Sequence, residues 1–246
     1  MFCIKYITLK QLLKHNVKII KLFSLIILVV LIGFTSCGSN SSGTNEGVVT
    51  YEISYPVPFE DKWMERLMPK EMEMRFKDGL LKTELSFAVG MIKIAYLSDQ
   101  KNRKLYELMK FMKKKNYAIR NQDEVNLMMS QIPPHKITPG NATKMIAGYT
   151  CKNAMVEVHN DTTDYEFELW YTEELGSKDL NWCSPFSPIQ GVLMEYQIER
   201  FDVTMKFTAK NVDLEEYPED EFLIPEKYTK ISYQEMMENL EQLKDI

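Results

Sequence analysis

Histidine and cysteine are scarce in this sequence, which has three histidines and four cysteines among 246 residues. It also lacks a Gly-x-Ser-x-Gly elbow, a phosphate-binding loop, an HExxH pair and a dinucleotide-binding fingerprint. Each of these motifs supplies a nucleophile, a phosphate cradle or a metal site to a large class of enzymes. We therefore expect a protein that is not an enzyme, with no catalytic residue, cofactor or metal ion. An enzyme of another class is the least favoured alternative.

Long basic clusters are also missing from the chain. It has 30 Lys and Arg against 35 Asp and Glu, a formal charge of −5. Proteins that bind nucleic acid need clustered Lys and Arg to contact phosphates, so we expect no nucleic-acid partner. The one local exception is Lys113-Lys114-Lys115, which we interpret as a solvated turn between strands.

An apolar segment near the N-terminus indicates export. Five lysines and no acidic residue precede it, and the small polar sequence GSNSSGTNEG follows it. The apolar run, Leu22 to Thr35, has 14 residues, fewer than the ~20 of a membrane-spanning helix. The ending Phe34-Thr35-Ser36-Cys37 is similar to the lipobox of bacterial lipoproteins, so we predict cleavage after residue 36 and a lipid on Cys37. An uncleaved anchor or an ordinary signal peptide is the alternative.

Cleavage would leave 210 of the 246 residues. They contain no segment typical of an interdomain linker, so we expect one domain over residues 48–246. The removed lysines would change the formal charge from −5 to −10. Residues 37–47 are predicted to be a flexible tether. Because Gly38 replaces the aspartate usual for inner-membrane retention, similarity to other lipoproteins predicts the periplasmic face of the outer membrane, with the lipid on Cys37 as the membrane contact.

Two cysteines remain in the predicted domain, Cys151 and Cys183. Export would place them where disulfides form. A bridge between them would close a loop of about 30 residues and contribute ~3 kcal/mol. We favour this bridge. Two separate free thiols, with Cys151 in a strand core and Cys183 in a loop, are the alternative.

The titratable side chains of the domain are interpreted as structural. His135 follows Pro133-Pro134 and is predicted to lie in a loop, whereas His159 ends a strand. The two histidines with an acid such as Asp161 or Asp164 are an alternative, but a zinc site normally needs three or four ligands. General acid–base work would require a buried carboxyl group with a raised pKa. We instead assign to solvated strand faces the alternating carboxylates Glu71 and Glu73, and Glu166 and Glu168.

Alternation of apolar and polar residues predicts that most of the domain is β-strand. The pattern begins at residues 47–55. The clearest hairpin is 71–85, where Asp78-Gly79 supplies a two-residue turn. That turn would pair Phe76 with Leu81, Met74 with Thr83 and Met72 with Leu85. Further strands are predicted at 91–97, 103–111, 116–119, 150–159, 165–172, 191–198, 203–210 and 222–225.

Three short helices are predicted at 59–68, 122–131 and 232–244, from apolar residues at helical spacing. Asn121 with Glu124, and Ser232 with Glu235, have the spacing of capping boxes. Residues 175–188 are predicted to be a loop. Nine to eleven antiparallel strands usually curl, split or close. We therefore predict a mainly β (α+β) fold, a single strongly curved antiparallel sheet or open half-barrel with about three short helices on its concave side.

Two stretches of the sequence resemble an exported bacterial family. The first is Asp78 to Glu84, followed by Ile94 to Tyr106 and Tyr117. The second, Lys144 to Lys152, resembles the family's IAGY-x-C segment. The family is domain-of-unknown-function family 4412, with the related GLPGLI group, and looks related to the LolA/LolB lipoprotein carriers. The resemblance implies an open half-barrel whose helices plug an apolar cavity, and it implies no catalytic residue.

Methionine is abundant, with 16 residues, of which Met1 would be removed. We favour the interpretation that the methionines pack in an ordinary hydrophobic core, because methionine pairs occupy positions where core residues belong. A cavity for acyl chains is the second interpretation, since methionine forms adaptable apolar surfaces. A copper(I) site is the third. The pairs are Met72 and Met74, Met128 and Met129, and Met236 and Met237.

These observations predict a non-enzymatic envelope lipoprotein that binds a lipid, an acyl chain or a lipoprotein in an apolar cavity. The alternative is a structural or protein-interaction module with a filled core, which meets its partners through its acidic surface. The predicted lining of the cavity is Trp63, Met64, Met72, Met74, Phe76, Leu81, Leu85, Met128 and Met129.

Overall fold

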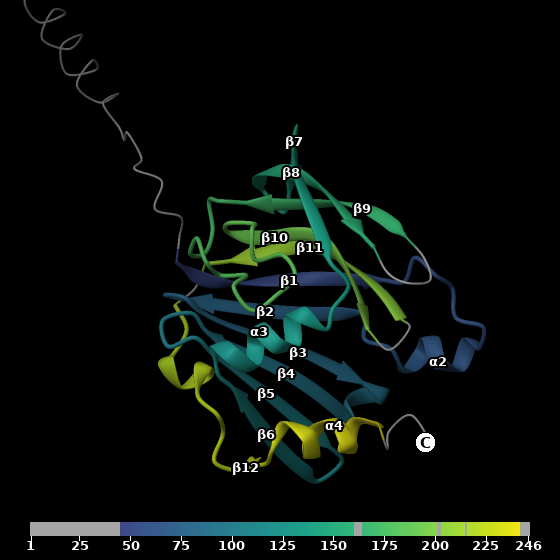
Figure 1. Cartoon of the computed structure of the whole chain (residues 1–246), viewed down its shortest axis with the longest axis vertical. Coiled ribbons are helices and arrows are strands. Elements are labelled where there is room, and N and C mark those ends of the chain that lie inside the picture. The colour runs from purple at the N-terminus through teal and green to yellow at the C-terminus, as the bar shows by residue number, and fades with distance from the viewer. Residues whose placement is uncertain (1–44, 160–163, 201–202, 215, 242–246) are drawn as a thin grey trace, which may run out of the picture. The chain divides into compact units, whose positions relative to one another are not determined.

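The computed structural model describes residues 45–159, 164–200, 203–214 and 216–241. Its strands form one open twelve-stranded sheet in the order β12-β6-β5-β4-β3-β2-β1-β11-β10-β9-β8-β7 (Figure 1). The predicted fold class, mainly β with a single open sheet and about three helices, is confirmed. The strands are β1 (Glu46–Ser54), β2 (Glu71–Lys77), β3 (Leu80–Phe87), β4 (Ile92–Asp99), β5 (Lys104–Phe111), β6 (Lys114–Arg120), β7 (His135–Ile146), β8 (Tyr149–Val158), β9 (Tyr165–Thr172), β10 (Val192–Arg200), β11 (Val203–Asp213) and β12 (Thr229–Lys230).

The described residues include three α-helices, α2 (Lys62–Leu67), α3 (Gln122–Ser130) and α4 (Tyr233–Glu241). The predicted capping box of α3 is confirmed, because the Asn121 side chain accepts from the Glu124 amide at 3.0 Å and the Asn121 amide donates to the Glu124 carboxylate at 2.7 Å. Two 3-10 turns are η1 (Ala88–Gly90) and η2 (Glu219–Phe222). Within the described ranges, no helix combines the length and hydrophobicity needed to cross a bilayer.

The β2–β3 hairpin has the predicted register. Phe76 pairs with Leu81 and Met74 with Thr83. The turn residues Asp78 and Gly79 both have positive φ, 46° and 85°. This is the combination that a type I′ turn requires, and an Asp-Gly pair adopts it readily. The local chemistry of the turn therefore determines which side chains of β2 and β3 share a face.

The long strand β7 is not predicted from the sequence. It includes Pro139 and Gly140, and its pairing with β8 shifts register between Pro139 and Thr143. β7 is an edge strand and is mostly exposed, so its residues show no alternation of apolar and polar side chains. Proline is tolerated on an edge because its missing amide donor faces no neighbour. The prediction that His135 lies in a loop is wrong, since it begins β7 and pairs with Val158.

Two further boundaries differ from the predictions. Residues 222–225 are not a strand; η2 occupies 219–222, and the short strand β12 pairs with β6 in parallel instead. β1 begins at Glu46, so the last two residues of the predicted tether pair with β2. The signal segment, Cys37 and the tether as far as residue 44 lie outside the described residues.

One face of the sheet, here called the inner face, supports the largest core. Its side chains come from β1, β2 and β8–β11, and residues of the loop 173–191 pack on them. Tyr51 is fully buried there and donates to the Leu193 carbonyl at 2.6 Å. α3 covers the inner face of β5 through Val125 beside Leu105, and α4 covers β5 and β6 through Met236. α2 buries no side chain.

The opposite, outer face of the sheet is covered in part by the C-terminal segment 218–228. Leu97 and Leu108 form a second core with Phe222 of η2, and Tyr106, Ile224 and other partly buried residues pack against it. Because residues alternate between faces along a strand, β4 and β5 bury apolar side chains on both sides.

Candidate functional site

The nine residues predicted to line one cavity do not lie together. Met72, Met74 and Phe76 are buried in the main core, and Leu81 and Leu85 pack against it. Met128 and Met129 belong to a separate cluster around Trp182. Trp63 and Met64 are exposed on α2. The predicted common lining is therefore wrong, although the assignment of Met72 and Met74 to an ordinary core is confirmed.

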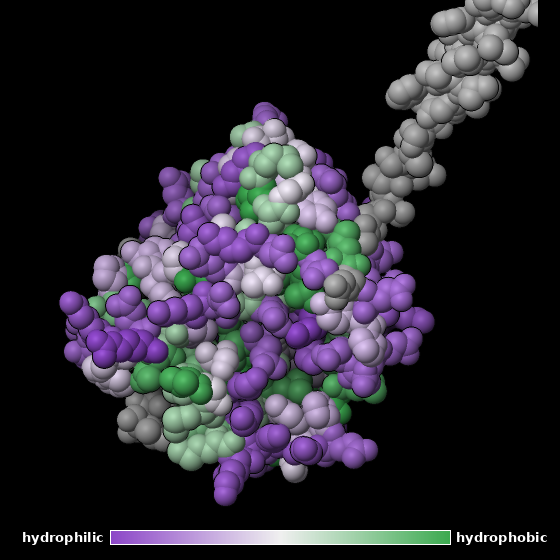
Figure 2. Space-filling model, turned by 180° about the vertical axis from the view of Figure 1, so that it is seen from behind, coloured by the Kyte–Doolittle hydropathy of each residue, from purple (hydrophilic) through white to green (hydrophobic). Residues whose placement is uncertain are grey.

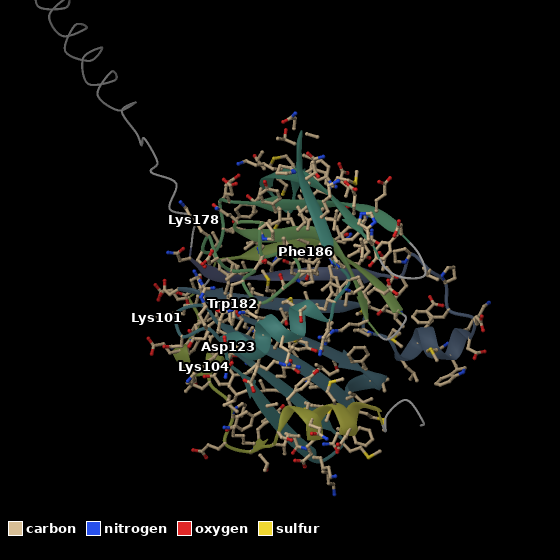
Figure 3. The ribbon with its side chains drawn as sticks, in the orientation of Figure 1. Lys101, Lys104, Asp123, Lys178, Trp182 and Phe186 are labelled. Atoms are coloured by element: carbon tan, nitrogen blue, oxygen red, sulfur yellow. The ribbon has the colours of Figure 1, made fainter. Side chains whose placement is uncertain are left out.

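The loop 173–191 fills the inner face where a ligand was predicted. Phe186 is 2% exposed, and its ring meets those of Phe167 and Tyr196 edge-on at centroid distances of 6.3 and 5.9 Å. Trp182 donates its indole N–H to Ser98 Oγ of β4 at 2.9 Å. Figure 3 shows both aromatic residues in front of the sheet. A buried ligand would have to displace these loop side chains.

The predicted disulfide is not formed. Cys151 and Cys183 are both free thiols. Cys151 is fully buried in the main core on β8, whereas Cys183 packs beside Trp182 in the separate cluster. Burial raises the pKa of Cys151 to about 11, so this thiol is protonated and unreactive at neutral pH. The two cysteines lie in different packing environments, as the alternative interpretation predicted.

The histidines and alternating carboxylates do not converge. His159 Nδ1 lies 3.3 Å from Asp164 on the surface, while the ring of His135 meets Phe186 edge-on. Asp161 lies outside the described residues. The interpretation of four carboxylates as solvated strand faces is confirmed by their exposure; they are Glu71, Glu73, Glu166 and Glu168. In the part of the chain that the structure describes, no cluster of three or more His, Cys, Asp and Glu could hold a metal.

A groove on the outer face is a candidate binding site. Its volume is about 640 Å³, within the ~300–1,000 Å³ usual for ligand sites. β3–β5 supply one wall and η2 with the residues after it supplies the other. Figure 2 views the molecule from this side and shows hydrophobic surface between hydrophilic residues. The apolar residues of the groove are Leu80, Leu97, Tyr106, Phe222, Leu223 and Ile224.

The charged residues of the groove are mainly acidic. They are Asp78, Asp99 and Glu219, with Lys77 as the one cation of the lining. Lys77 is already paired with Glu46, at 2.8 Å between Nζ and Oε1. Lys77 also lies near Asp78 and Glu219. The groove therefore presents apolar surface beside an excess of negative charge, with three carboxylates and one lysine. This combination favours a ligand that is apolar and positively charged.

A small polar cluster, here called the clamp, holds the η2 wall against the sheet. The Glu46 carboxylate accepts from Lys77 and also from the Tyr217 amide at 2.6 Å. Lys77 donates in addition to the Tyr217 carbonyl at 2.8 Å, and Lys82 donates to the Glu221 carbonyl at 2.6 Å. These hydrogen bonds join β1, β2 and β3 to a segment that lies about 140 to 170 residues later in the chain. They fix the position of one wall of the groove.

The clamp predicts a pH dependence of stability. The hydrogen bond from Lys77, with that from Tyr217, lowers the pKa of Glu46 below its usual 4.5. A lowered pKa in the folded state contributes stability above 4.5 that is lost as the pH falls through the lowered value. In urea unfolding, Glu46→Gln should be less stable than wild type at pH 6, and the difference should shrink below pH 4.5.

Glu71→Gln is the matched control for this measurement, because Glu71 is exposed and outside the clamp. We expect it to match wild type throughout. A Glu46→Gln deficit that is equally large at pH 3 and pH 6 would contradict a role for the carboxylate charge.

Sequence reasoning missed the groove. Its walls come from β3–β5 and from a C-terminal segment that the sequence predicts to include a strand. The only available signal was the apolar set Phe222, Leu223 and Ile224 between acidic residues and Pro225. Nothing local indicates which face of the sheet such a segment covers.

Comparisons with known proteins are sparse. No protein-family model and no curated protein matches the sequence. Among solved structures, the chain is similar to the structure of PNGF-II in a P21 space group, with a TM-score of 0.47 and 13% sequence identity. The match covers 79% of this chain and 33% of that chain, so this chain spans about a third of its length.

Proposed function

We propose that the chain is a non-enzymatic envelope lipoprotein, anchored by a lipid on Cys37, and that its domain is a protein-interaction module. The groove on the outer face is the observation on which this proposal depends. It combines about 640 Å³ of space with an apolar floor and three carboxylates. The partner it suits is a protein segment with apolar side chains beside Lys or Arg.

The filled inner face supports the interaction module over an acyl carrier. Met72, Met74 and Phe76 are each at most 5% exposed, and the loop 173–191 packs on the same core. Close-packed interiors leave little room for a chain of methylene groups. Binding of a lipid or acyl chain remains a second proposal, and it would require the loop 173–191 to move.

The same proposal includes export, a location at the outer membrane and membership of domain-of-unknown-function family 4412. They depend on the basic, apolar and small-residue order of residues 1–37 and on the two motif-like stretches. A tethered domain with a formal charge near −10 would present its acidic surface to other envelope proteins.

Site-specific photocrosslinking in intact cells tests the groove. A crosslinking amino acid replaces Leu223, which lies in the groove and is 64% exposed, or Leu127, a 62% exposed residue on α3. We expect one dominant protein adduct from position 223 and none of the same mass from position 127. The double change Asp78→Asn and Glu219→Gln should reduce that adduct severalfold, because it removes two of the carboxylates.

These substitutions are chosen to leave the fold intact. Asp78 and Glu219 are exposed, and asparagine tolerates the positive φ of position 78. Identical adducts at positions 223 and 127 would contradict the proposal, as would an adduct at 223 that is unaffected by the charge removal.

A further inference from the structure

An exposed apolar tip lies at the end of the sheet where β3 passes into β4 and β5 into β6. The tip consists of Val89, Met91 and Met112, which are 95%, 50% and 54% exposed. The Met112 amide donates to the Met91 carbonyl at 2.9 Å, so the two turns are joined. Figure 2 shows hydrophobic surface at its lower left, at this end of the sheet. Three large apolar side chains are thus grouped in water rather than scattered.

The backbone of the tip is strained. Val89 has φ 54° and ψ 38°, and Ala88 and Met112 also have positive φ. A β-branched residue in the left-handed region is an outlier, since its branched side chain crowds the backbone there. Glycine or asparagine would adopt this conformation more easily. The valine therefore costs stability and buries almost nothing within the described fold.

Lysines surround the tip. Lys93, Lys110 and Lys115 occupy directly opposed positions on β4, β5 and β6, and so form a row across the outer face. Lys113 lies in the β5–β6 turn and Lys114 begins β6. Like charges in opposed positions destabilise a sheet. Lys93 is paired with Glu84, but Lys110, Lys113 and Lys114 make no ion pair within the described ranges.

We propose that the apolar tip and its lysines form a membrane-contact surface that binds a bilayer containing anionic lipid. Val89, Met91 and Met112 would enter the interface between headgroups and acyl chains, and the lysines would contact lipid phosphates. The charge pattern favours an anionic bilayer as the partner, because these lysines are clustered on a chain whose formal charge is −5. The contact is separate from the outer groove and does not depend on a lipid at Cys37.

The test uses the full chain in phosphatidylcholine vesicles, with or without phosphatidylglycerol. A trace of photoactivatable phospholipid labels the residues that reach the bilayer, and mass spectrometry locates the label. We expect labelling at Met91 and Met112 that depends on phosphatidylglycerol. Lys113→Gln with Lys114→Gln should weaken it by up to about 30-fold, because each lysine near an anionic surface strengthens binding about fivefold.

The control pair is Lys101→Gln with Lys104→Gln, which removes two exposed lysines from the opposite end of the same strands (Figure 3). It should leave the labelling unchanged. Val89→Asn provides a second test that does not risk unfolding. It should reduce labelling severalfold without lowering the melting temperature, because asparagine suits the positive φ.

Three outcomes would overturn the proposal. The first is equal labelling of the tip on neutral and anionic vesicles. The second is equal loss of labelling in the Lys113/Lys114 and Lys101/Lys104 variants. The third is a tip that carries no lipid label but crosslinks to a protein in cells. That result would identify this surface as a protein-docking site.

Discussion

Replacing Phe186 by alanine should lower the free energy of unfolding by about 3–5 kcal/mol, the usual cost of removing a buried phenylalanine ring. Phe186 is the largest of the side chains by which the loop 173–191 packs into the main core. Its ring meets three others edge-on, those of Phe167, Tyr196 and His135. Truncation would remove these contacts and leave a cavity beneath the loop. The strands cannot move far enough to fill that cavity. Urea unfolding followed by circular dichroism measures the change.

Leu127→Ala is the matched control, because Leu127 is 62% exposed on α3. Surface substitutions of this kind change stability by no more than about 0.5 kcal/mol. The comparison also bears on the second proposed function. A Phe186→Ala variant as stable as wild type would mean that the inner face is not close-packed. That result would favour binding of an acyl chain over the protein-interaction function.

Arg120→Ala should destabilise the protein by about 3–5 kcal/mol, because it would leave the Glu107 carboxylate buried without its partner. Arg120 Nε lies 2.9 Å from Glu107 Oε1, and the two side chains are only 7% and 9% exposed. They lie on the inner faces of β6 and β5, and the ring of Tyr233 in α4 stacks on the guanidinium group. Thermal and urea unfolding both report the loss.

A double variant separates the charge effect from packing. Arg120→Met combined with Glu107→Leu removes both charges and retains apolar volume, so it should be more stable than Arg120→Met alone. The exposed pair of Lys210 and Glu52 is the second control; Lys210→Ala should cost no more than ~1 kcal/mol. If the single and double variants at positions 107 and 120 were equally unstable, lost packing rather than an unpaired charge would explain the effect.

The features predicted correctly are those determined by residues close together in the chain. The Asp78-Gly79 turn sets the register of β2 and β3, since both residues adopt positive φ. The Asn121 and Glu124 side chains satisfy the first amides of α3 at the predicted spacing. In both cases a local geometric requirement selects the residue type, and the sequence therefore indicates the structure directly.

The errors have a common cause. Alternation along β2 indicates that Met72, Met74 and Phe76 share a buried face, but it does not indicate what buries them. The loop 173–191 covers that face, and its contacts connect distant residues, such as Trp182 with Ser98 of β4. The same applies to the cysteines, which occupy separate cores.

The sequence by itself determined the class of fold, the Asp78-Gly79 turn and the capping of α3, and it predicts export. Each follows from periodicity, from backbone preference or from the order of charge and hydrophobicity along a short segment. The tertiary structure alone decided that the inner face is filled, that the acidic groove lies on the outer face and that lysines from three strands meet beside the apolar tip. Those arrangements depend on which segments pair and pack across the sheet, and no local pattern encodes the partner of a strand or the cover of a face.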